Sequence, residues 1–356
     1  MSFTRSSFNW RSWLGCLLLL GALESFAVAA PVTLFYIGSG PESVRDFLAH
    51  SSQIDLAVPT WYQVDDNGLV TGGPEPLVYQ RAKAENVPLM PLIALFNKQK
   101  FHTLASSAEA QKQMNDKLLA DAAQFGYVGY QFDFEDIDYR DRDLLSAVVK
   151  TTADVLHAHG LKLTIATVPN APGGPGNGSF NKWMWTDWRG AYDLAAIGKS
   201  VDLVCLMTYD QHTRWTMPGP VAGWQWTVDN VNYALRFVPK EKLSLGIPVY
   251  GYHWYTDGPI HDKDEDKPSH GAAYIGAPNA MLLAQSYKAQ IQWDEQDRTA
   301  YFWFYRDQMR EWVFYTDKRT FEERYNLVKQ LGLEGFCSWV LGEEDPAIWT
   351  VLPKRN

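Results

Sequence analysis

The sequence has few cysteines and no metal-binding motif. Three cysteines occur among 356 residues, without a C-x-x-C pair, and the eight histidines include no H-E-x-x-H. A zinc site or a disulfide framework needs more of these residues at ligand or bridge spacing. We therefore expect neither a metal nor a cofactor.

Clusters of basic residues are also absent. The 32 Lys and Arg residues are outnumbered by 41 Asp and Glu residues, and no Lys/Arg-rich block occurs. Nucleic acid is therefore not an expected partner, because its phosphates require a basic patch. What the chain does have is 46% hydrophobic and 21% charged residues, which is typical of a globular protein.

No apolar run is long enough to span a membrane. The most apolar stretch, residues 13–22, has about ten residues, whereas a spanning helix needs roughly 20. Arg5 and Arg11 precede it, and Ala27-Val28-Ala29 follows it. This is the pattern of a secretory signal peptide. We expect removal of residues 1–29 and export to the periplasm or the medium without a membrane partner; an uncleaved anchor is the alternative.

Cys205 and Cys337 would be the cysteines left after that cleavage. In an oxidising compartment they could pair. Both lie in apolar, strand-like runs, so buried free thiols are the favoured expectation.

Short apolar segments alternate with helical patterns along residues 30–356. Eight such segments can be counted: Val32–Ile37, Ile54–Val58, Val87–Leu95, Val128–Phe132, Leu161–Val168, Val201–Met207, Leu243–Val249 and Gly335–Val340. Near-continuous apolar strands separated by helices indicate a parallel sheet that is buried on both faces. We predict an α/β fold, a (β/α)8 TIM barrel. A doubly wound open sheet is the runner-up, although no G-x-G-x-x-G follows the first strand.

Helix boundaries can be placed in three of the intervening segments. Ser106 and Glu109 form a predicted capping box for a helix through Ala123, which Gly126 closes. Two further apolar stripes, at 144–156 and 321–331, end at Gly160 and Gly332.

Two segments depart from the simple alternation. Asn67-Gly68 within Trp61–Thr71 predicts a hairpin that extends the second strand. Residues 253–316 are too many for one barrel loop, and they include strand-like runs at Tyr301–Phe304 and Glu311–Tyr315. We interpret them as a small α/β insertion between the seventh strand and its helix.

The polar residues of the fourth strand carry the chemistry that we expect. Gln131, Asp133 and Glu135 alternate with aromatic residues and therefore share one face, which we place inside the barrel. Neighbours two apart in a strand are about 6.5–7 Å apart. When two inward carboxylates lie so close together, they cannot both ionise freely, and the pKa of one of them is raised. That group stays protonated, as the acid of a glycosidase must. An acidic loop with a purely structural role is the competing interpretation.

Four motifs occur in order along the chain. They are Val128–Glu135, Met207-Thr208-Tyr209-Asp210, Gly246–Gly251 and Ser338-Trp339. Together they resemble the motifs of glycoside hydrolase family 18, the chitinase-like family. Val128–Glu135 resembles its D-x-x-D-x-D-x-E, with Val128 and Gln131 at the first two Asp positions. The resemblance is closest to the bacterial branch of spore-cortex and peptidoglycan N-acetylglucosaminidases, to which Ala195–Lys199 and Trp293–Glu295 also point. The family's third-strand S-x-G-G is replaced by Leu92–Leu95.

The resemblance implies roles for these residues. Glu135 would protonate the glycosidic oxygen, Asp133 would orient the substrate's N-acetyl group as an internal nucleophile, and Tyr209 would donate a hydrogen bond to it. Gln131 would hydrogen-bond Asp133. Residues that would contact or surround the sugar are Gln131, Asp210, Trp339, Tyr36 and Tyr250. The implied partner is a polysaccharide or oligosaccharide that contains N-acetylglucosamine, either peptidoglycan or chitin-like.

Other interpretations remain open at this stage. The main alternative is a member of the family that binds carbohydrate without catalysis. It stays open because Val128 and Gln131 replace two Asp residues of the family's motif. An unrelated barrel enzyme is a third, because fold alone does not give function. Trp61, Trp215 and Trp303 could stack on sugars or simply pack, and His261–His270 is most simply an acidic surface loop.

Overall fold

The computed structural model describes residues 30–257 and 269–355, without the side chains of 256, 257, 269 and 270. The predicted signal peptide and most of the His261–His270 segment lie outside these residues. Within the described residues, no helix has the length and apolar character needed to cross a membrane.

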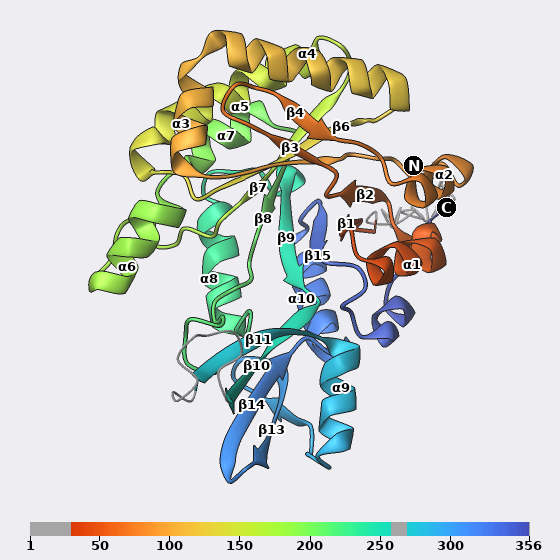
Figure 1. The fold of residues 1–356 in the computed structure, drawn as a ribbon, viewed down its shortest axis with the longest axis vertical. Coiled ribbons are helices and arrows are strands. Elements are labelled where there is room, and N and C mark those ends of the chain that lie inside the picture. Colours follow the sequence, from red (N-terminus) through yellow and green to blue (C-terminus); the bar gives the residue numbers. More distant parts are fainter. Residues whose placement is uncertain (1–29, 258–268, 356) are drawn as a thin grey trace, which may run out of the picture. The chain divides into compact units, whose positions relative to one another are not determined.

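Eight parallel strands form the central sheet, and each of the eight predicted segments overlaps one of them. They are β1 (Val32–Ile37), β2 (Leu56–Pro59), β5 (Leu92–Phe96), β6 (Gly129–Glu135), β7 (Lys162–Thr167), β8 (Leu203–Leu206), β9 (Leu243–Pro248) and β15 (Gly335–Trp339). The sheet order is β2-β1-β15-β9-β8-β7-β6-β5. A parallel bridge between Ala57 and Leu89, just before β5, joins the two edges. The predicted (β/α)8 barrel is confirmed (Figure 1).

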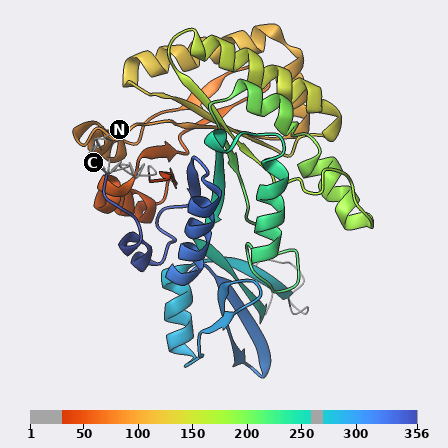
Figure 2. The same cartoon turned by 180° about the vertical axis from the view of Figure 1, so that it is seen from behind.

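Helices follow the strands in sequence and cover the outside of the sheet. In chain order they are α1 (Pro41–His50), α2 (Pro76–Ala84), α3 (Lys98–Ser106), α4 (Ala108–Phe125), α5 (Arg142–His157), α6 (Ser179–Met184), α7 (Leu194–Ser200), α8 (Trp224–Ala234) and α10 (Lys318–Leu331). Figure 2 shows α8 and α10 running alongside β9. Each strand therefore buries one face against helices and the other in the barrel interior.

One predicted helix start was wrong by one residue. Ser107, rather than Ser106, caps α4, because its side-chain oxygen accepts the N–H of Ala110. Ser106 ends the preceding helix α3 instead. The predicted end is confirmed: Gly126 caps α4 in the left-handed conformation that glycine adopts readily, with φ 71°.

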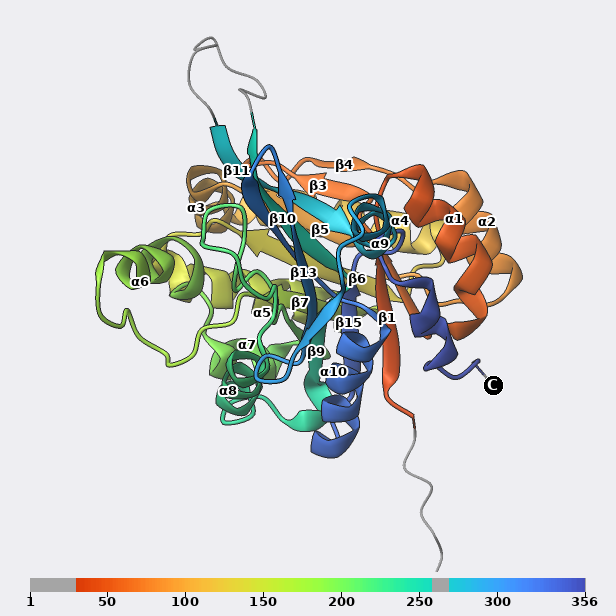
Figure 3. The same cartoon turned by 90° about the horizontal axis from the view of Figure 1, so that it is seen from below.

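The predicted hairpin and insertion are both present. Strands β3 (Tyr62–Val64) and β4 (Val70–Gly72) form the antiparallel hairpin. The insertion between β9 and α10 is a five-stranded antiparallel sheet with helix α9 (Ala277–Ser286) on one face. Its strands are β10 (Tyr250–Asp257), β11 (Ser269–Gly276), β12 (Gln292–Asp294), β13 (Thr299–Arg306) and β14 (Met309–Tyr315). Figure 3 looks onto the molecule from the insertion's end.

The expectation of free thiols was wrong. Cys205 on β8 and Cys337 on β15 form a disulfide, with Cα atoms 6.2 Å apart. These two strands flank β9, whose residues at the same level are Ser244 and Gly246. Because those two residues are small, the cysteine side chains can meet in front of β9 inside the barrel.

Candidate active site

The strand β6 places its acidic and aromatic residues on opposite faces, as predicted. Tyr130, Phe132 and Phe134 are fully buried on the helix-facing side, where the Tyr130 hydroxyl donates to the carbonyl of Leu118 on α4, at 2.8 Å. The alternation turns Asp133 and Glu135 toward the barrel interior. Their partners on the adjacent strand β5 are Ala94 and Phe96.

Burial raises the pKa values of both carboxyl groups. Asp133 is 5% exposed, and this desolvation raises its pKa to about 7. The pKa of Glu135 lies well above its usual range, first because of burial and then because of the negative charges of Asp133, Asp210 and Asp136. A carboxyl group with a raised pKa keeps its proton near neutral pH and can act as a general acid.

Gln131 does not take the place that we expected. Its Nε2 donates to Thr164 Oγ1 at 3.1 Å, and Thr164 in turn donates to the sulfur of Met90 at 3.2 Å. Because Gln131 is fully buried, its side chain is not accessible to a sugar. The predicted hydrogen bond to Asp133 is not among those of the described residues, in which Asp133 Oδ1 has no partner.

Two predicted aromatic residues lie together at the ends of neighbouring strands. Tyr36 is the last residue but one of β1, and its ring centroid lies 5.2 Å from that of Trp339 at the end of β15. Trp339 is half-buried. Burial raises the pKa of Tyr36, and the charges of Asp133 and Glu135 raise it further.

Tyr209 follows β8 and remains a hydrogen-bond donor at neutral pH. Burial raises its pKa first, and the charges of Tyr36, Asp133 and Glu135 add to the rise. A phenol whose pKa is raised keeps its proton. Tyr209 is therefore equipped to donate to an oxygen that gains negative charge.

Asp210 is held by tyrosine hydroxyls. It accepts from Tyr250 at 2.6 Å and from Tyr252 at 3.3 Å. Asp210 is exposed as a residue. Desolvation of its carboxyl group nevertheless raises its pKa, while both hydrogen bonds and the charge of Arg214 oppose the rise. Tyr250 is only 2% exposed and stacks on Tyr274 at 4.5 Å, so it positions Asp210 and does not present a sugar-binding surface.

Sequence reasoning missed several residues beside the site. Tyr192 donates to the carbonyl of Phe134 at 2.6 Å and so fixes the end of β6, but no motif marks it. Tyr252 could have been found from the alternation of aromatic residues after Tyr250. Lys98 forms an ion pair with Asp136, the residue after Glu135, at 3.5 Å, and lines a pocket of about 360 Å³.

The sequence pattern of the family described as "Glycosyl hydrolases family 18" matches residues 33–344. The chain belongs to this family. The predicted resemblance is thereby confirmed, and the prediction of a glycoside hydrolase is confirmed at the level of the family.

Two relatives from Bacillus subtilis show the branch of the family to which this chain is similar. The "Cortical fragment-lytic enzyme" is 26% identical over 82% of this chain and 65% of its own length. The chain therefore spans slightly less than two thirds of that relative. The "Uncharacterized glycosylase YvbX" is 24% identical over 92% of each chain.

Solved structures agree on the fold. The chitinase from Chromobacterium violaceum has a TM-score of 0.78 and 25% identity, over 90% of this chain and 97% of its own. The spore cortex-lytic enzyme SleL of Bacillus megaterium has the same TM-score at 22% identity, over 93% of this chain and 77% of its own. The latter likeness concerns the fold alone.

Proposed function

We propose that this member of glycoside hydrolase family 18 is an exported retaining glycosidase that hydrolyses β-1,4-linked N-acetylglucosamine polymers. The observation that carries the proposal is the pair Asp133 and Glu135 at the end of β6, of which Asp133 is buried and Glu135 is half-buried, both with raised pKa values. A protonated carboxylic acid at the carboxyl end of a barrel strand is the group that glycoside cleavage requires.

The first half of the reaction breaks the glycosidic bond. Protonated Glu135 gives its proton to the leaving oxygen as the bond to the anomeric carbon breaks. The carbonyl oxygen of the sugar's own N-acetyl group attacks the same carbon and forms an oxazolinium ion. Asp133 accepts the acetamide N–H and stabilises the positive charge, and Tyr209 donates to the acetamide oxygen.

The second half restores the enzyme. Ionised Glu135 removes a proton from water, whose oxygen attacks the anomeric carbon from the side that the leaving group vacated. The carbon–oxygen bond of the oxazolinium ring breaks, and the acetamide is regenerated. Two inversions at one carbon give net retention, and Glu135 is protonated again.

Export is supported by two independent features. Arg5, Arg11 and the short apolar run at 13–22 have the form of a signal peptide. The Cys205–Cys337 disulfide suits an oxidising compartment outside the cytosol.

The proposed substrate is a polymer outside the cell, and two kinds of polymer contain the required β-1,4-linked N-acetylglucosamine. One relative is named for the lysis of cortical fragments and one similar structure is a chitinase. We therefore propose peptidoglycan glycan strands or chitooligosaccharides. The alternative is a silent, lectin-like protein, which Val128 and Gln131 favour; the retention of both Asp133 and Glu135 favours the enzyme.

Mass spectrometry of reaction products separates these possibilities. Residues 30–356 are incubated with peptidoglycan and, separately, with chitooligosaccharides, beside the Glu135→Gln variant. New N-acetylglucosamine reducing ends from one polymer, absent with the variant, establish the enzyme and its substrate. No product from either polymer, with sugar binding retained by both proteins, establishes the lectin-like alternative.

A further inference from the structure

Apolar and sulfur-containing side chains fill the interior of the barrel around the disulfide. We call this group the interior cluster. Its buried members are Leu34, Tyr36, Val58, Met90, Leu92, Leu203, Cys205 and Cys337. Val128, at the first Asp position of the family's motif, and Trp339 pack against it. The interior cluster thus connects the disulfide with two residues of the candidate active site.

Strand register places Cys337 one inward layer below Tyr36 and Trp339. Leu34 on β1 pairs with Cys337 on β15. Tyr36 and Trp339 lie two residues further along the same two strands, and residues two apart in a strand share a face. Their rings, with centroids 5.2 Å apart, therefore lie next to the disulfide layer, toward the carboxyl ends of the strands.

The Tyr36 hydroxyl reaches across the barrel to the disulfide. It donates to Cys205 Sγ at 3.2 Å, although β15 and β9 lie between β1 and β8 in the sheet. Tyr36 is only 1% exposed, so its hydroxyl is shielded from bulk water. A disulfide sulfur carries no proton and can only accept a hydrogen bond. The bridge therefore provides a fixed acceptor for this hydroxyl.

The disulfide also joins two strands that lead to predicted sugar-contacting residues. Cys337 lies two residues before Trp339, and Cys205 lies four residues before Tyr209. Strands β8 and β15 are not neighbours in the sheet, because β9 lies between them. The covalent bridge therefore restrains the spacing of two strands that share no ladder of backbone hydrogen bonds.

We propose that the Cys205–Cys337 disulfide is a positioning element of the active site, which holds Tyr36 and Trp339 in the geometry that binds the reacting sugar. This inference rests on the proposed function, to which the sugar contacts of Tyr36 and Trp339 belong. Side chains that are already ordered bind and orient a substrate at a lower entropic cost than mobile ones. Without the bridge, Tyr36 and Trp339 occupy a wider range of positions, and the sugar binds more weakly.

The main test is glycan binding by a chain that lacks the bridge. Calorimetry is performed in the inactive Glu135→Gln background, with a chitooligosaccharide and, separately, with a soluble peptidoglycan fragment, well below the unfolding temperature. We expect Cys205→Ala combined with Cys337→Ala to raise the Kd about five- to tenfold, which corresponds to the loss of one neutral hydrogen bond.

Val204→Ala is the matched control for a loss of stability alone. Val204 precedes Cys205 on β8, is fully buried and belongs to the cluster on the helix-facing side of the sheet. This variant lowers the midpoint of thermal unfolding while the disulfide and the Kd stay unchanged. A double cysteine variant with a lower unfolding midpoint and an unchanged Kd would show that the bridge only stabilises the fold, and would overturn the inference.

Tyr36→Phe provides a second test, which also applies when the double cysteine variant does not fold. It keeps the bridge and the aromatic ring but removes the hydroxyl that contacts Cys205. We expect the Kd to rise about threefold. An unchanged Kd would mean that the contact with the disulfide does not position the ring for sugar binding.

Oxidative footprinting by mass spectrometry tests the geometry without sugar. In the double cysteine variant we expect modification of Trp339 to become about twofold faster or more, because local opening exposes the ring. Trp312, which is half-buried on the insertion, serves as the internal control. If the wild type neither binds nor hydrolyses sugar, the proposed function is rejected; faster modification of Trp339 still supports its positioning by the disulfide, and an unchanged rate overturns it.

Discussion

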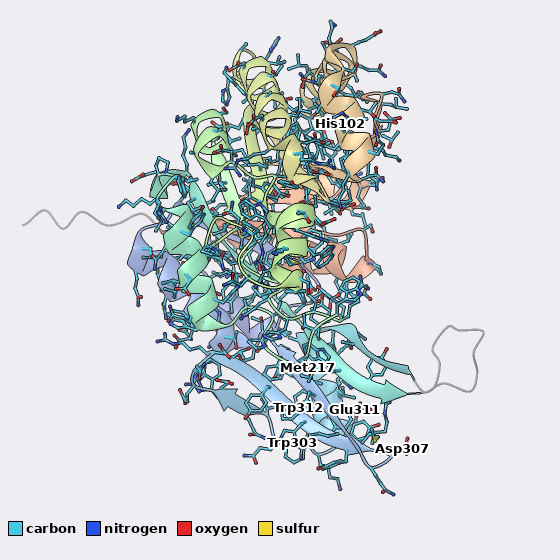
Figure 4. All side chains as sticks on the ribbon, turned by 90° about the vertical axis from the view of Figure 1, so that its left-hand side faces the viewer. His102, Met217, Trp303, Asp307, Glu311 and Trp312 are labelled. Atoms are coloured by element: carbon cyan, nitrogen blue, oxygen red, sulfur yellow. A yellow bond between two sulfur atoms is a disulfide. The ribbon has the colours of Figure 1, made fainter. Side chains whose placement is uncertain are left out.

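Two sheets of this molecule hold carboxylates that are buried or half-buried, and the two sites differ in whether the carboxylates form ion pairs. On β14 of the insertion, Glu311 is fully buried and accepts from His253 Nε2 at 2.6 Å and from Arg306 Nε at 2.7 Å (Figure 4). On β6 of the barrel, Asp133 and Glu135 have no ion pair among the described residues, and their pKa values rise. A buried carboxylate that forms ion pairs has a structural role. A carboxylate without an ion pair, whose pKa is raised, can donate or accept a proton near neutral pH.

The substitution Glu135→Gln has the largest expected effect. Glutamine keeps the shape of the side chain but cannot donate an acidic proton, so we expect turnover to fall about 10³-fold or more. Sugar binding, measured by calorimetry, is retained. Turnover within tenfold of the wild type would remove Glu135 from the role of general acid.

The paired carboxylate gives the complementary result. Glu311→Ala leaves His253 and Arg306 without their shared acceptor, and we expect a loss of about 3–5 kcal/mol in the free energy of unfolding. Urea unfolding measures this loss, and kcat of the folded fraction stays within twofold. A variant that is fully stable but inactive would show that the comparison between the two sheets is wrong.

The pH dependence of stability distinguishes the unpaired carboxylates. The pKa of Asp133 is about 7 in the folded protein and about 3.9 in the unfolded chain, so the folded state is favoured while the group is protonated. That stability is lost as the pH rises from about 4 through 7, by about 4 kcal/mol in all. Asp133→Asn removes the loss. We expect the variant to exceed the wild type in stability at pH 8 but not at pH 4.

Catalysis depends on pH with the same sign. The protonated form of Glu135 is the active one, so kcat/KM falls as the pH rises above its raised pKa. An activity profile that keeps rising toward alkaline pH would exclude Glu135 as the acid.

Asp210 is an intermediate case, because its partners are hydroxyls and not cations. Tyr250→Phe removes the 2.6 Å hydrogen bond, and we expect about a tenfold fall in kcat/KM together with a further rise in the pKa of Asp210. Tyr252→Phe removes the 3.3 Å contact and costs about threefold or less. Steady-state kinetics of the two variants give the comparison; a larger effect of Tyr252→Phe would reverse the assigned order.

The parts of the fold that follow from periodicity were predictable. The eight barrel strands and the inward face of β6 depend on local alternation of apolar and polar residues, which the sequence displays directly. The order of four motifs then placed Asp133, Glu135 and Tyr209 at the same end of the barrel. Each of these inferences needs only neighbours in the chain and the geometry of parallel strands.

The features that were missed depend on contacts between distant segments. The partner of Gln131 is Thr164, one strand away, and nothing local to either residue selects that pairing. The disulfide depends on the small residues of β9 between two cysteines 132 positions apart. Ser107 rather than Ser106 caps α4 because the preceding helix α3 extends through Ser106. Local propensity defines such a helix end only to within a residue or two.

The Cys205–Cys337 disulfide has a consequence for the integrity of the chain. The 132-residue separation encloses β9, the whole insertion and α10 within one covalent ring. A protease that cuts once anywhere between the two cysteines, even in the insertion, therefore leaves a single covalent molecule. The cut separates the two parts only under reducing conditions, so a nicked chain keeps them joined through the disulfide inside the barrel.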